Sequence, residues 1–283
     1  MTDLGDLLGR VGVDDFFSSY FERRPLHVRR AINQPWLTET DVDGLIRATA
    51  QVDSRRLRAN VRGQVLVPPS NCGASDTYDW AISSYASGAT LVLNYVEALD
   101  LRYASLASAL GVSLHAKVTF TVFMTPAGAQ GFAPHFDTLD VFVMQMAGQK
   151  EWHLGDFAVE LPTLRQGYLV AGNPESRSTV QMKSGDMLYI PRGTIHWAHT
   201  QEQPSLHVTA DIDTATMGDL LDAAVAHSAL LNDESAFSVR AAERLAQNKG
   251  GVMDHDLAGL LRSVRDLPEL CRLARADKWS RRR

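Results

Sequence analysis

The chain has 283 residues, of which 45% are hydrophobic and 22% are charged, and its formal net charge is −5. This composition is ordinary for a globular protein and excludes a disordered or fibrous chain. The negative balance argues against a dedicated nucleic-acid binder, because such proteins usually carry a basic surface. The two cysteines, Cys72 and Cys271, are far apart in the sequence. Neither a disulfide scaffold nor a thiolate zinc site is therefore expected.

The sequence offers no pattern that would direct the chain to a membrane. Its longest apolar runs fall short of the roughly 18 residues that a membrane span needs. The first ten residues, MTDLGDLLGR, are acidic and lack the apolar core of a secretory signal. We therefore expect a cytoplasmic protein, with one large domain and a small addition or with two modest domains.

Residues 1–110 mix helical and extended patterns. Asp14 and Asp15 are expected to cap a short helix with an aromatic face, which Pro25 ends. A second helix is predicted to begin at Thr38 and to run through Thr49. The other predictions are an extended segment at 25–30, a loop at 68–80, a buried strand at 89–96 and a helix at 101–110.

From about residue 115 to 213 the pattern changes to short strands, which are separated by turns that contain Gly, Pro or Asn. Strands are predicted at 117–125, 139–148, 150–154, 178–182, 186–190 and 205–212. Many short strands without helices between them are typical of an antiparallel barrel or sandwich, a class that includes jelly rolls and cupins.

Residues 214–283 have helical spacing and no strand pattern. Leu220, Leu221 and Val225 begin an apolar stripe of the kind that covers a neighbouring surface. This region is expected either to cover the barrel or to pair with a second copy of the chain.

One motif in the β region has the chemistry of a metal site. His135 and Asp137 are two residues apart, so on a strand their side chains leave the same face. His196 lies downstream, after a short apolar strand and a Pro-Arg-Gly turn, and supplies a third candidate ligand. Two histidines and one carboxylate form the facial triad of non-haem Fe(II) oxygenases, which leaves open positions for a co-substrate and O₂.

Other interpretations of these residues remain open at this point. A single H-x-D sequence is more often a surface strand or a capped turn than a metal site. The matching β context of His196 favours a metal, but zinc or another ion in a non-catalytic cupin uses the same donors.

Lys150 is a second indication of the chemistry. Apart from Lys117, it is the only lysine or arginine between Gly111 and Arg165, and it has apolar neighbours in Met146 and Trp152. A lysine in such a place is ordinarily a strand end whose stem lies on apolar surface. In an oxygenase that uses 2-oxoglutarate, it would instead hold the far carboxylate of the co-substrate, a charge too costly to bury unpaired.

Several long segments resemble the ribosomal oxygenases, which belong to the JmjC-type cupin group of 2-oxoglutarate- and Fe(II)-dependent hydroxylases. In the β region the resemblance is carried by TPAGAQGFAPHFDTLDVFVMQMAGQKEWHL, GDMLYIPRGTIHWAHT and PSLHVTADI. Before it, FFSSYFERRPLHVRRA and ATLVLNYVEALD are also similar to the family. Together these segments cover most of residues 14–213.

The resemblance implies a mainly β fold with helices, a double-stranded β-helix of the JmjC/cupin type in residues 1–213 with its barrel core at about 115–213. It implies that His135, Asp137 and His196 bind Fe(II) and that Lys150 binds the C5 carboxylate of 2-oxoglutarate. O₂ is then the other co-substrate. The expected reaction is hydroxylation of an amino-acid side chain in a protein or peptide, with ribosomal proteins among the candidate substrates.

The chain also departs from the family. Phe123 stands where the family often has a tyrosine hydroxyl near the co-substrate, and Thr121 or Thr209 is expected to replace that hydroxyl, although both also suit ordinary strand positions. The resemblance favours a homodimer through helices in residues 214–283, with the family's winged-helix domain absent. Two alternatives follow: a hydroxylase of a small metabolite or natural-product intermediate, and a metal-binding cupin without catalysis, which has no need of a buried Lys150.

Further polar residues receive structural interpretations. His199 is three residues from His196 and is expected on the opposite face of its strand, either at the surface or as a residue that supports the ligands without binding the metal. His207 is expected to be a structural histidine that faces the barrel interior. A cluster of four arginines is expected to be the solvated face of a helix, with docking of an acidic peptide or nucleic acid as the alternative: Arg55, Arg56, Arg58 and Arg62.

Overall fold

The computed structural model describes residues 3–162, 170, 172 and 174–216. The chain divides into two compact units, one of residues 1–113 with 118–213 and one of residues 114–117 with 214–283. The first unit carries the sheet and the site, and it is described by itself below. The helices and the dimer contact that the sequence predicts after residue 216 lie outside the described residues.

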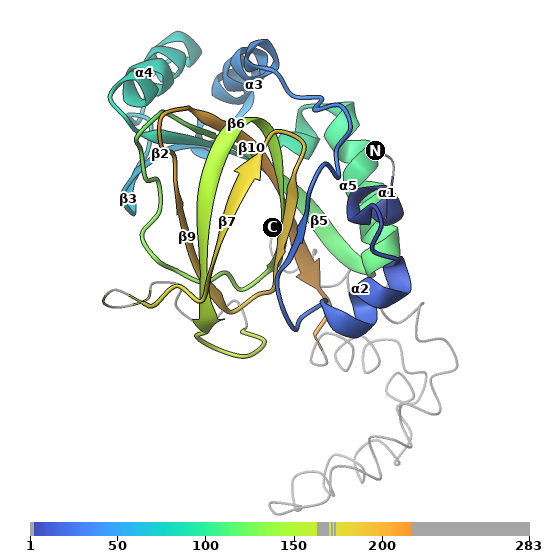
Figure 1. Cartoon of the computed structure of the whole chain (residues 1–283). Coiled ribbons are helices and arrows are strands. Elements are labelled where there is room, and N and C mark those ends of the chain that lie inside the picture. The colour runs from blue at the N-terminus through green and yellow to red at the C-terminus, as the bar shows by residue number, and fades with distance from the viewer. Residues whose placement is uncertain (1–2, 163–169, 171, 173, 217–283) are drawn as a thin grey trace, which may run out of the picture. The chain divides into compact units, whose positions relative to one another are not determined.

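The first unit is built on a sheet in which every pairing described below is antiparallel. The strand order is β1-β8-β6-β10-β5-β4-β2-β3, and β7 and β9 both pair with β6 (Figure 1). The strands are β1 (Leu26–Val28), β2 (Leu57–Val61), β3 (Gln64–Leu66), β4 (Thr90–Asn94), β5 (Ala116–Thr125), β6 (Asp140–Phe157), β7 (Ser178–Lys183), β8 (Met187–Ile190), β9 (Thr194–His199) and β10 (Ser205–Thr214). The predicted antiparallel jelly-roll core is thus confirmed.

Strand β6 holds the barrel together, because four other strands pair with it. Its first half pairs with β8 and β10, and its second half pairs with β7 and β9. The sequence predicted two strands here, at 139–148 and 150–154, but the chain bends at Gly148 and continues as one strand. Gly148 has a φ of 64°, and a Cβ at this position would lie 1.8 Å from the carbonyl oxygen of Pro204. Only glycine permits this bend at so close an approach.

Apolar side chains from the strands around β6 line much of the barrel interior. Alternate residues of β6 and its neighbours face this interior, as period-two strands require. One buried cluster consists of Val141, Val143, Trp152, Leu154, Met182, Leu188, Ile190 and Ala198. Because this cluster includes strands on both sides of β6, it fixes the register that positions the site residues.

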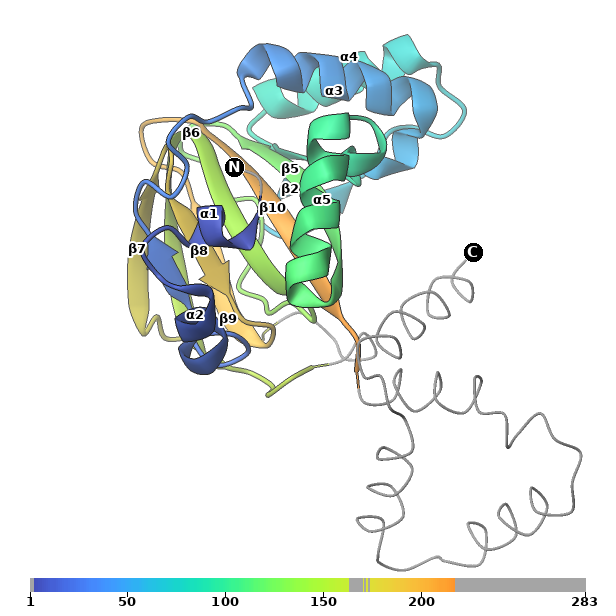
Figure 2. The same ribbon diagram turned by 90° about the vertical axis from the view of Figure 1, so that its right-hand side faces the viewer.

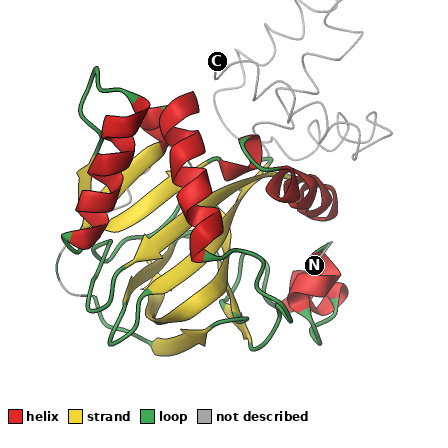
Figure 3. Cartoon of the chain, turned by 90° about the horizontal axis from the view of Figure 1, so that it is seen from above, coloured by secondary structure: helices red, strands yellow, loops and turns green. Residues whose placement is uncertain are grey.

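The helices lie outside the sheet, as the view from above shows (Figure 3). They are α1 (Leu4–Leu8), α2 (Val13–Ser19), α3 (Glu39–Val52), α4 (Ala74–Ala86) and α5 (Leu101–Leu114), with short 3₁₀ turns η1 (Ser54–Arg56) and η2 (Val96–Ala98). Helices α3 and α4 lie side by side, and α4 packs against β2 and β4 (Figure 2). None of the described helices is long and apolar enough to cross a membrane.

Two of the N-terminal predictions require correction. Residues 68–80 were predicted as a loop, but α4 begins at Ala74, where Asp76 accepts a hydrogen bond of 3.1 Å from the Gly73 backbone and so caps the helix. The helix buries only the small residues Thr77 and Ala81, so its sequence lacks a strong apolar stripe. Helix α2 begins at Val13 rather than after an aspartate cap, although Phe16 of its aromatic face is fully buried.

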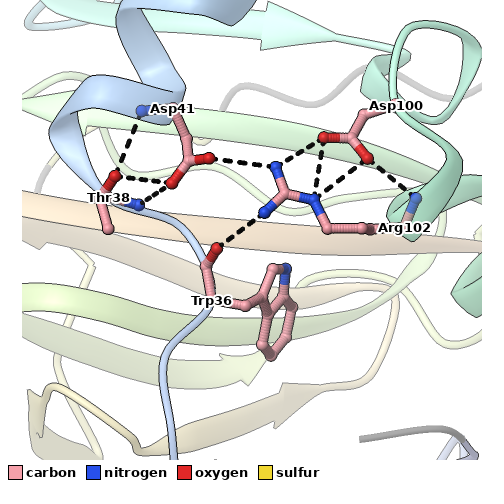
Figure 4. A network of polar contacts seen from close by, with 5 residues as sticks. All are labelled: Trp36, Thr38, Asp41, Asp100 and Arg102. Atoms are coloured by element: carbon pink, nitrogen blue, oxygen red, sulfur yellow. Dashed lines mark hydrogen bonds and ion pairs between the residues drawn. The ribbon is translucent and has the colours of Figure 1, made fainter.

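Helix α3 begins where the sequence predicted, at a capping box. The Thr38 hydroxyl accepts from the Asp41 backbone, and the Asp41 carboxylate accepts from the Thr38 backbone (Figure 4). Arg102 of α5 then binds Asp41 at 3.2 Å, Asp100 at 2.6 Å and the Trp36 carbonyl at 3.1 Å (Figure 4). This network attaches the start of α3 to the start of α5.

Candidate metal centre and active-site cavity

The backbone brings the two candidate histidines together. His135 precedes β6 and forms an isolated antiparallel bridge with His196 of β9. Each residue donates its backbone N–H to the other's carbonyl, at 3.1 Å from His135 and 2.8 Å from His196. The Gly193 N–H also donates to the Asp137 carbonyl at 2.8 Å. The H-x-D segment is therefore attached to the turn and strand that carry His196.

The three candidate side chains converge on one point. Their donor atoms all lie within 4.8 Å of one another. Asp137 is 3.9 Å from the Nε2 of His135 through Oδ1 and 3.5 Å from the Nε2 of His196 through Oδ2. The sequence placed these residues on one face of the barrel, and the structure brings all three together. Two imidazoles and a carboxylate are a donor set that fits a divalent first-row metal.

Hydrogen bonds to the backbone orient both imidazoles. The Nδ1 of His135 lies 2.8 Å from the Ala133 carbonyl, and the Nδ1 of His196 lies 2.9 Å from the Thr194 carbonyl. A carbonyl only accepts, so each Nδ1 carries the proton and each Nε2 presents its lone pair. Burial, together with the nearby His135, lowers the pKa of His196 to about 4. His196 is therefore neutral at physiological pH, as a metal ligand must be.

The three residues open into a cavity of about 340 Å³ inside the barrel. All the residues that the sequence proposed for the co-substrate also line it, namely Lys150, Thr121 and Thr209. Phe123, His207 and Asp211 line the same cavity. The residues that line the cavity thus include a metal-type cluster, one lysine and several aromatic rings.

Lys150 is buried in the wall of this cavity. Lys150 is only 5% exposed, and its Nζ donates to the Thr125 hydroxyl at 3.0 Å. No carboxylate among the described residues pairs with it. Burial therefore lowers the pKa of Lys150 to about 7. Thr125, a contact that the sequence did not suggest, lies on the same face of β5 as Thr121 because the two are four residues apart.

Asp211 is a cavity residue that the sequence reasoning missed. It accepts a hydrogen bond of 2.9 Å from the Thr121 hydroxyl. Burial, together with the Asp137 carboxylate, raises the pKa of Asp211 to about 7. The alternation of β10 could have indicated it, since His207 and Thr209 were expected inside and Asp211 is the next residue on that face.

His207 lines the cavity and is not a structural histidine with all its hydrogen bonds formed. Its ring stacks on Phe123 with centroids 4.7 Å apart and planes 6° apart. Its Nδ1 is buried and has no hydrogen-bond partner among the described residues. Burial and the nearby Lys150 hold the pKa of His207 well below its usual range. The imidazole therefore stays neutral beside the lysine.

The sequence predicts that the arginine cluster lies on the face of a helix, but the structure shows that it does not. Arg55 and Arg56 belong to the 3₁₀ turn η1 and pair with Asp53, whereas Arg58 is on β2 and lines the cavity. The close spacing of these arginines did not distinguish a helix from a short turn followed by a strand, because both can expose arginines at such positions. Asn60 of β2 and Asn94 of β4 line the cavity with Arg58.

Comparison with known proteins identifies the domain. Residues 101–220 match the family model of the JmjC domain. The chain is 31% identical over 238 residues to the bifunctional lysine-specific demethylase and histidyl-hydroxylase NO66 of Dictyostelium discoideum, an alignment of 77% of this chain and 44% of that protein. It is 29% identical over 232 residues to human ribosomal oxygenase 1, with 77% and 35% of the two chains covered. The chain thus spans less than half the length of these curated relatives.

Solved structures share the fold of this chain. The structure of the Escherichia coli ribosomal oxygenase YcfD superposes with a TM-score of 0.58 at 16% identity and covers 91% of this chain and 68% of that one. Another structure of YcfD contains cobalt and 2-oxoglutarate and superposes with a TM-score of 0.56 at 15% identity, over 91% and 67% of the two chains. At this identity the comparison establishes the fold. With a JmjC domain that carries the H-x-D segment and His196, the chain belongs to the ribosomal-oxygenase-like group of the JmjC family.

Proposed function

We propose that the chain is a 2-oxoglutarate- and Fe(II)-dependent oxygenase that hydroxylates an amino-acid side chain in a protein or peptide. One observation carries this proposal: a cluster of two histidines and one aspartate shares a cavity with a buried lysine that has no carboxylate partner among the described residues. A metal site alone would not require that lysine. A site for a metal and a dicarboxylic co-substrate would.

In this proposal, His135, Asp137 and His196 hold Fe(II). The Nδ1 hydrogen bonds of the two histidines and the backbone bridge between them keep the imidazoles in place before the metal binds. When bound, Fe(II) and 2-oxoglutarate supply an oxidative decarboxylation that consumes O₂, releases succinate and CO₂ and delivers one oxygen atom to the substrate. The apolar barrel wall excludes water from that chemistry.

Lys150 holds the C5 carboxylate of 2-oxoglutarate. A carboxylate in this apolar wall needs a cation, and Lys150 is the buried amine that can provide one. We also propose Thr121 and Thr209 as residues that contact the co-substrate, because both line the same cavity. Thr125 positions the lysine by accepting its hydrogen bond.

The proposed substrate class follows the relatives. Two of them are named as a histidyl-hydroxylase and a ribosomal oxygenase, so a side chain of a ribosomal or other protein is the first candidate. Asp211 and Arg58 add a carboxylate and a guanidinium to the cavity wall, which favours a polar side chain over an apolar one.

The test is conversion of 2-oxoglutarate to succinate by the purified chain with Fe(II). We expect turnover in the wild type, none in the His135→Ala and Asp137→Ala variants, and a large loss in Lys150→Met. Lys183→Met, which removes an exposed lysine from the strand paired with β6, is the matched control and should retain turnover. A correctly metallated chain that neither binds nor consumes 2-oxoglutarate would instead be a non-catalytic cupin.

A mass-spectrometric screen for the gain of one oxygen then identifies the substrate. Ribosomal proteins and peptides are offered first, and small metabolites second. Oxygen gain in a ribosomal protein or another peptide supports the proposed substrate class. Gain only in a small molecule would place the chain with hydroxylases of metabolites.

We further propose that residues 214–283 form a helical region through which two copies pair, and that the protein acts in the cytoplasm. The helical spacing and apolar stripe of that segment support the first proposal. Sedimentation equilibrium of the full chain, compared with a chain that ends at residue 216, tests it. A monomeric full chain would contradict the pairing.

A further inference from the structure

A second group of two histidines and one carboxylate lies outside the cavity. It consists of Glu151 and His153 on β6 and His199 on β9, whose ligand atoms all lie within 4.8 Å of one another. None of the three lines the cavity that holds the first cluster. The register explains the separation, since Glu151 is opposite His199 across the two strands while the inward residues Lys150 and Trp152 alternate with the group.

Both imidazoles are directed at the same carboxylate oxygen. The Oε1 of Glu151 is 3.0 Å from the Nε2 of His153 and 3.6 Å from the Nε2 of His199. These separations are similar to the 3.9 and 3.5 Å between Asp137 and the histidines of the first cluster. The three donor atoms therefore surround a common point, as the ligands of one ion do.

The surroundings hold these side chains in place. The other oxygen of Glu151, Oε2, accepts hydrogen bonds from the amides of Gln181 and Gln201, the latter at 3.0 Å. The Nδ1 of His153 is 3.3 Å from the Thr179 hydroxyl, and its ring stacks on Trp197 with centroids 5.1 Å apart. In metal sites, the ring nitrogen or carboxylate oxygen that does not bind the metal is typically hydrogen-bonded to a neighbouring residue.

The group is accessible to an ion from solvent. The side chains of Glu151, His153 and His199 are 18%, 19% and 34% exposed. A single divalent cation satisfies both Nε2 lone pairs and the carboxylate oxygen together.

We propose that Glu151, His153 and His199 form a second metal site, which binds one late first-row divalent ion such as Zn²⁺, with water in the remaining positions. Imidazole and carboxylate donors suit this class of ion. The ion joins β6 to β9 three residues beyond His196, so it stabilises the strand that carries a residue of the first cluster. This site is independent of the proposed oxygenase function.

The experiment measures the stoichiometry of Zn²⁺ binding by calorimetry on the metal-free full chain. The first cluster is removed with a His135→Ala/Asp137→Ala background, which isolates the second site. We expect this background to bind one equivalent and to rise in melting temperature when Zn²⁺ is added. Adding Glu151→Gln, His153→Ala or His199→Ala to the background should abolish both effects.

Asp156→Asn in the same background is the matched control, because Asp156 is a 66% exposed carboxylate of the same strand that pairs with Arg177. It should leave the Zn²⁺ equivalent unchanged. Glu151→Gln keeps the shape of the side chain, and circular dichroism verifies that each variant is folded. The proposal is wrong if the folded background binds no Zn²⁺, or if its equivalent persists in the Glu151→Gln and His199→Ala variants.

Discussion

His135 and His196 are joined through their backbones as well as across the candidate metal centre. Each accepts a hydrogen bond from the other's N–H, although 60 residues lie between them in the sequence. The bridge does not depend on either side chain. The position of the imidazoles is therefore set by the folding of the barrel, before any metal binds.

Replacing one of these imidazoles should separate metal binding from folding. We expect His135→Ala to retain the backbone bridge and to change the free energy of unfolding by about 1 kcal/mol. Mutation of a residue that only hydrogen-bonds to a metal ligand typically lowers metal affinity by roughly 10- to 100-fold. Because His135 is itself a proposed ligand, the affinity of the variant for Co²⁺ at this centre should fall by more than that. Urea denaturation and a Co²⁺ titration measure the two quantities. A folded variant with unchanged Co²⁺ affinity would contradict the assignment of His135.

Binding of 2-oxoglutarate should be coupled to the uptake of a proton by Lys150. Burial lowers the pKa of this lysine to about 7, so at pH 8 the free amine is mostly neutral, and a bound carboxylate raises its pKa again. We expect nearly one proton to be taken up at pH 8 and much less at pH 6. The affinity should then weaken up to about tenfold per pH unit above pH 7.

Calorimetry in two buffers with different heats of ionisation measures this uptake. The Lys150→Met variant should show none of the pH-dependent component, whereas Lys183→Met should match the wild type. Equal uptake at pH 6 and pH 8 would mean that Lys150 is not the group that meets the co-substrate.

The same lysine should make the ligand-free fold more stable at alkaline pH. Between its folded pKa of about 7 and its ordinary value of 10.5, the unfolded chain binds a proton that the folded chain has released. Stability therefore rises with pH in this window, by at most about 1.4 kcal/mol per unit. Relative to Lys150→Met, the wild type should gain about 2 to 3 kcal/mol from pH 7 to pH 9, measured by urea denaturation. A parallel pH dependence of the two proteins would contradict this.

Tyr189 should be important for stability because its hydroxyl serves two partners. It donates to Asp140 at 2.5 Å and accepts from the Glu22 backbone at 2.8 Å. Burial raises the pKa of Asp140 to about 6, so at pH 8 its carboxylate is charged and needs that donor. Tyr189→Phe should lower the free energy of unfolding by about 2 to 3 kcal/mol at pH 8. Tyr95→Phe, at a tyrosine 49% exposed, is the control and should have little effect.

The bend of β6 should depend on Gly148. A Cβ there would meet the Pro204 carbonyl oxygen at 1.8 Å, in addition to the strain of its positive φ. Gly148→Ala should therefore cost about 3 kcal/mol or more. Gly128 has a similar φ of 66° but nothing within 4 Å of its Cβ position, so Gly128→Ala should cost only about 1 to 2 kcal/mol. Equal losses in the two variants would show that the close approach to Pro204 is unimportant.

The sequence predicted the parts of the site that depend on local pattern. The spacing of His135 and Asp137, the strand–turn context of His196 and the apolar surroundings of Lys150 are all legible over short distances, and the structure brings these residues to one cavity. The resemblance to the ribosomal oxygenases also indicated the jelly-roll core. Local pattern was less informative for α4, because this helix buries only Thr77 and Ala81 and its sequence therefore has no strong apolar stripe.

Strand register decided the rest, since it depends on the packing of the whole barrel. Asp211 reaches the cavity because β10 pairs with β6, and Thr125 reaches Lys150 across the barrel interior. The pairing of β9 with β6 places His199 opposite Glu151. Sequence spacing alone puts only Glu151 and His153 on one face of a strand, so the complete second cluster depends on this pairing. By itself the sequence determined which donor residues the strands carry. Only the tertiary structure decided which of them meet, because a strand's neighbours come from distant parts of the chain and a shift of one residue would turn each side chain to the other face.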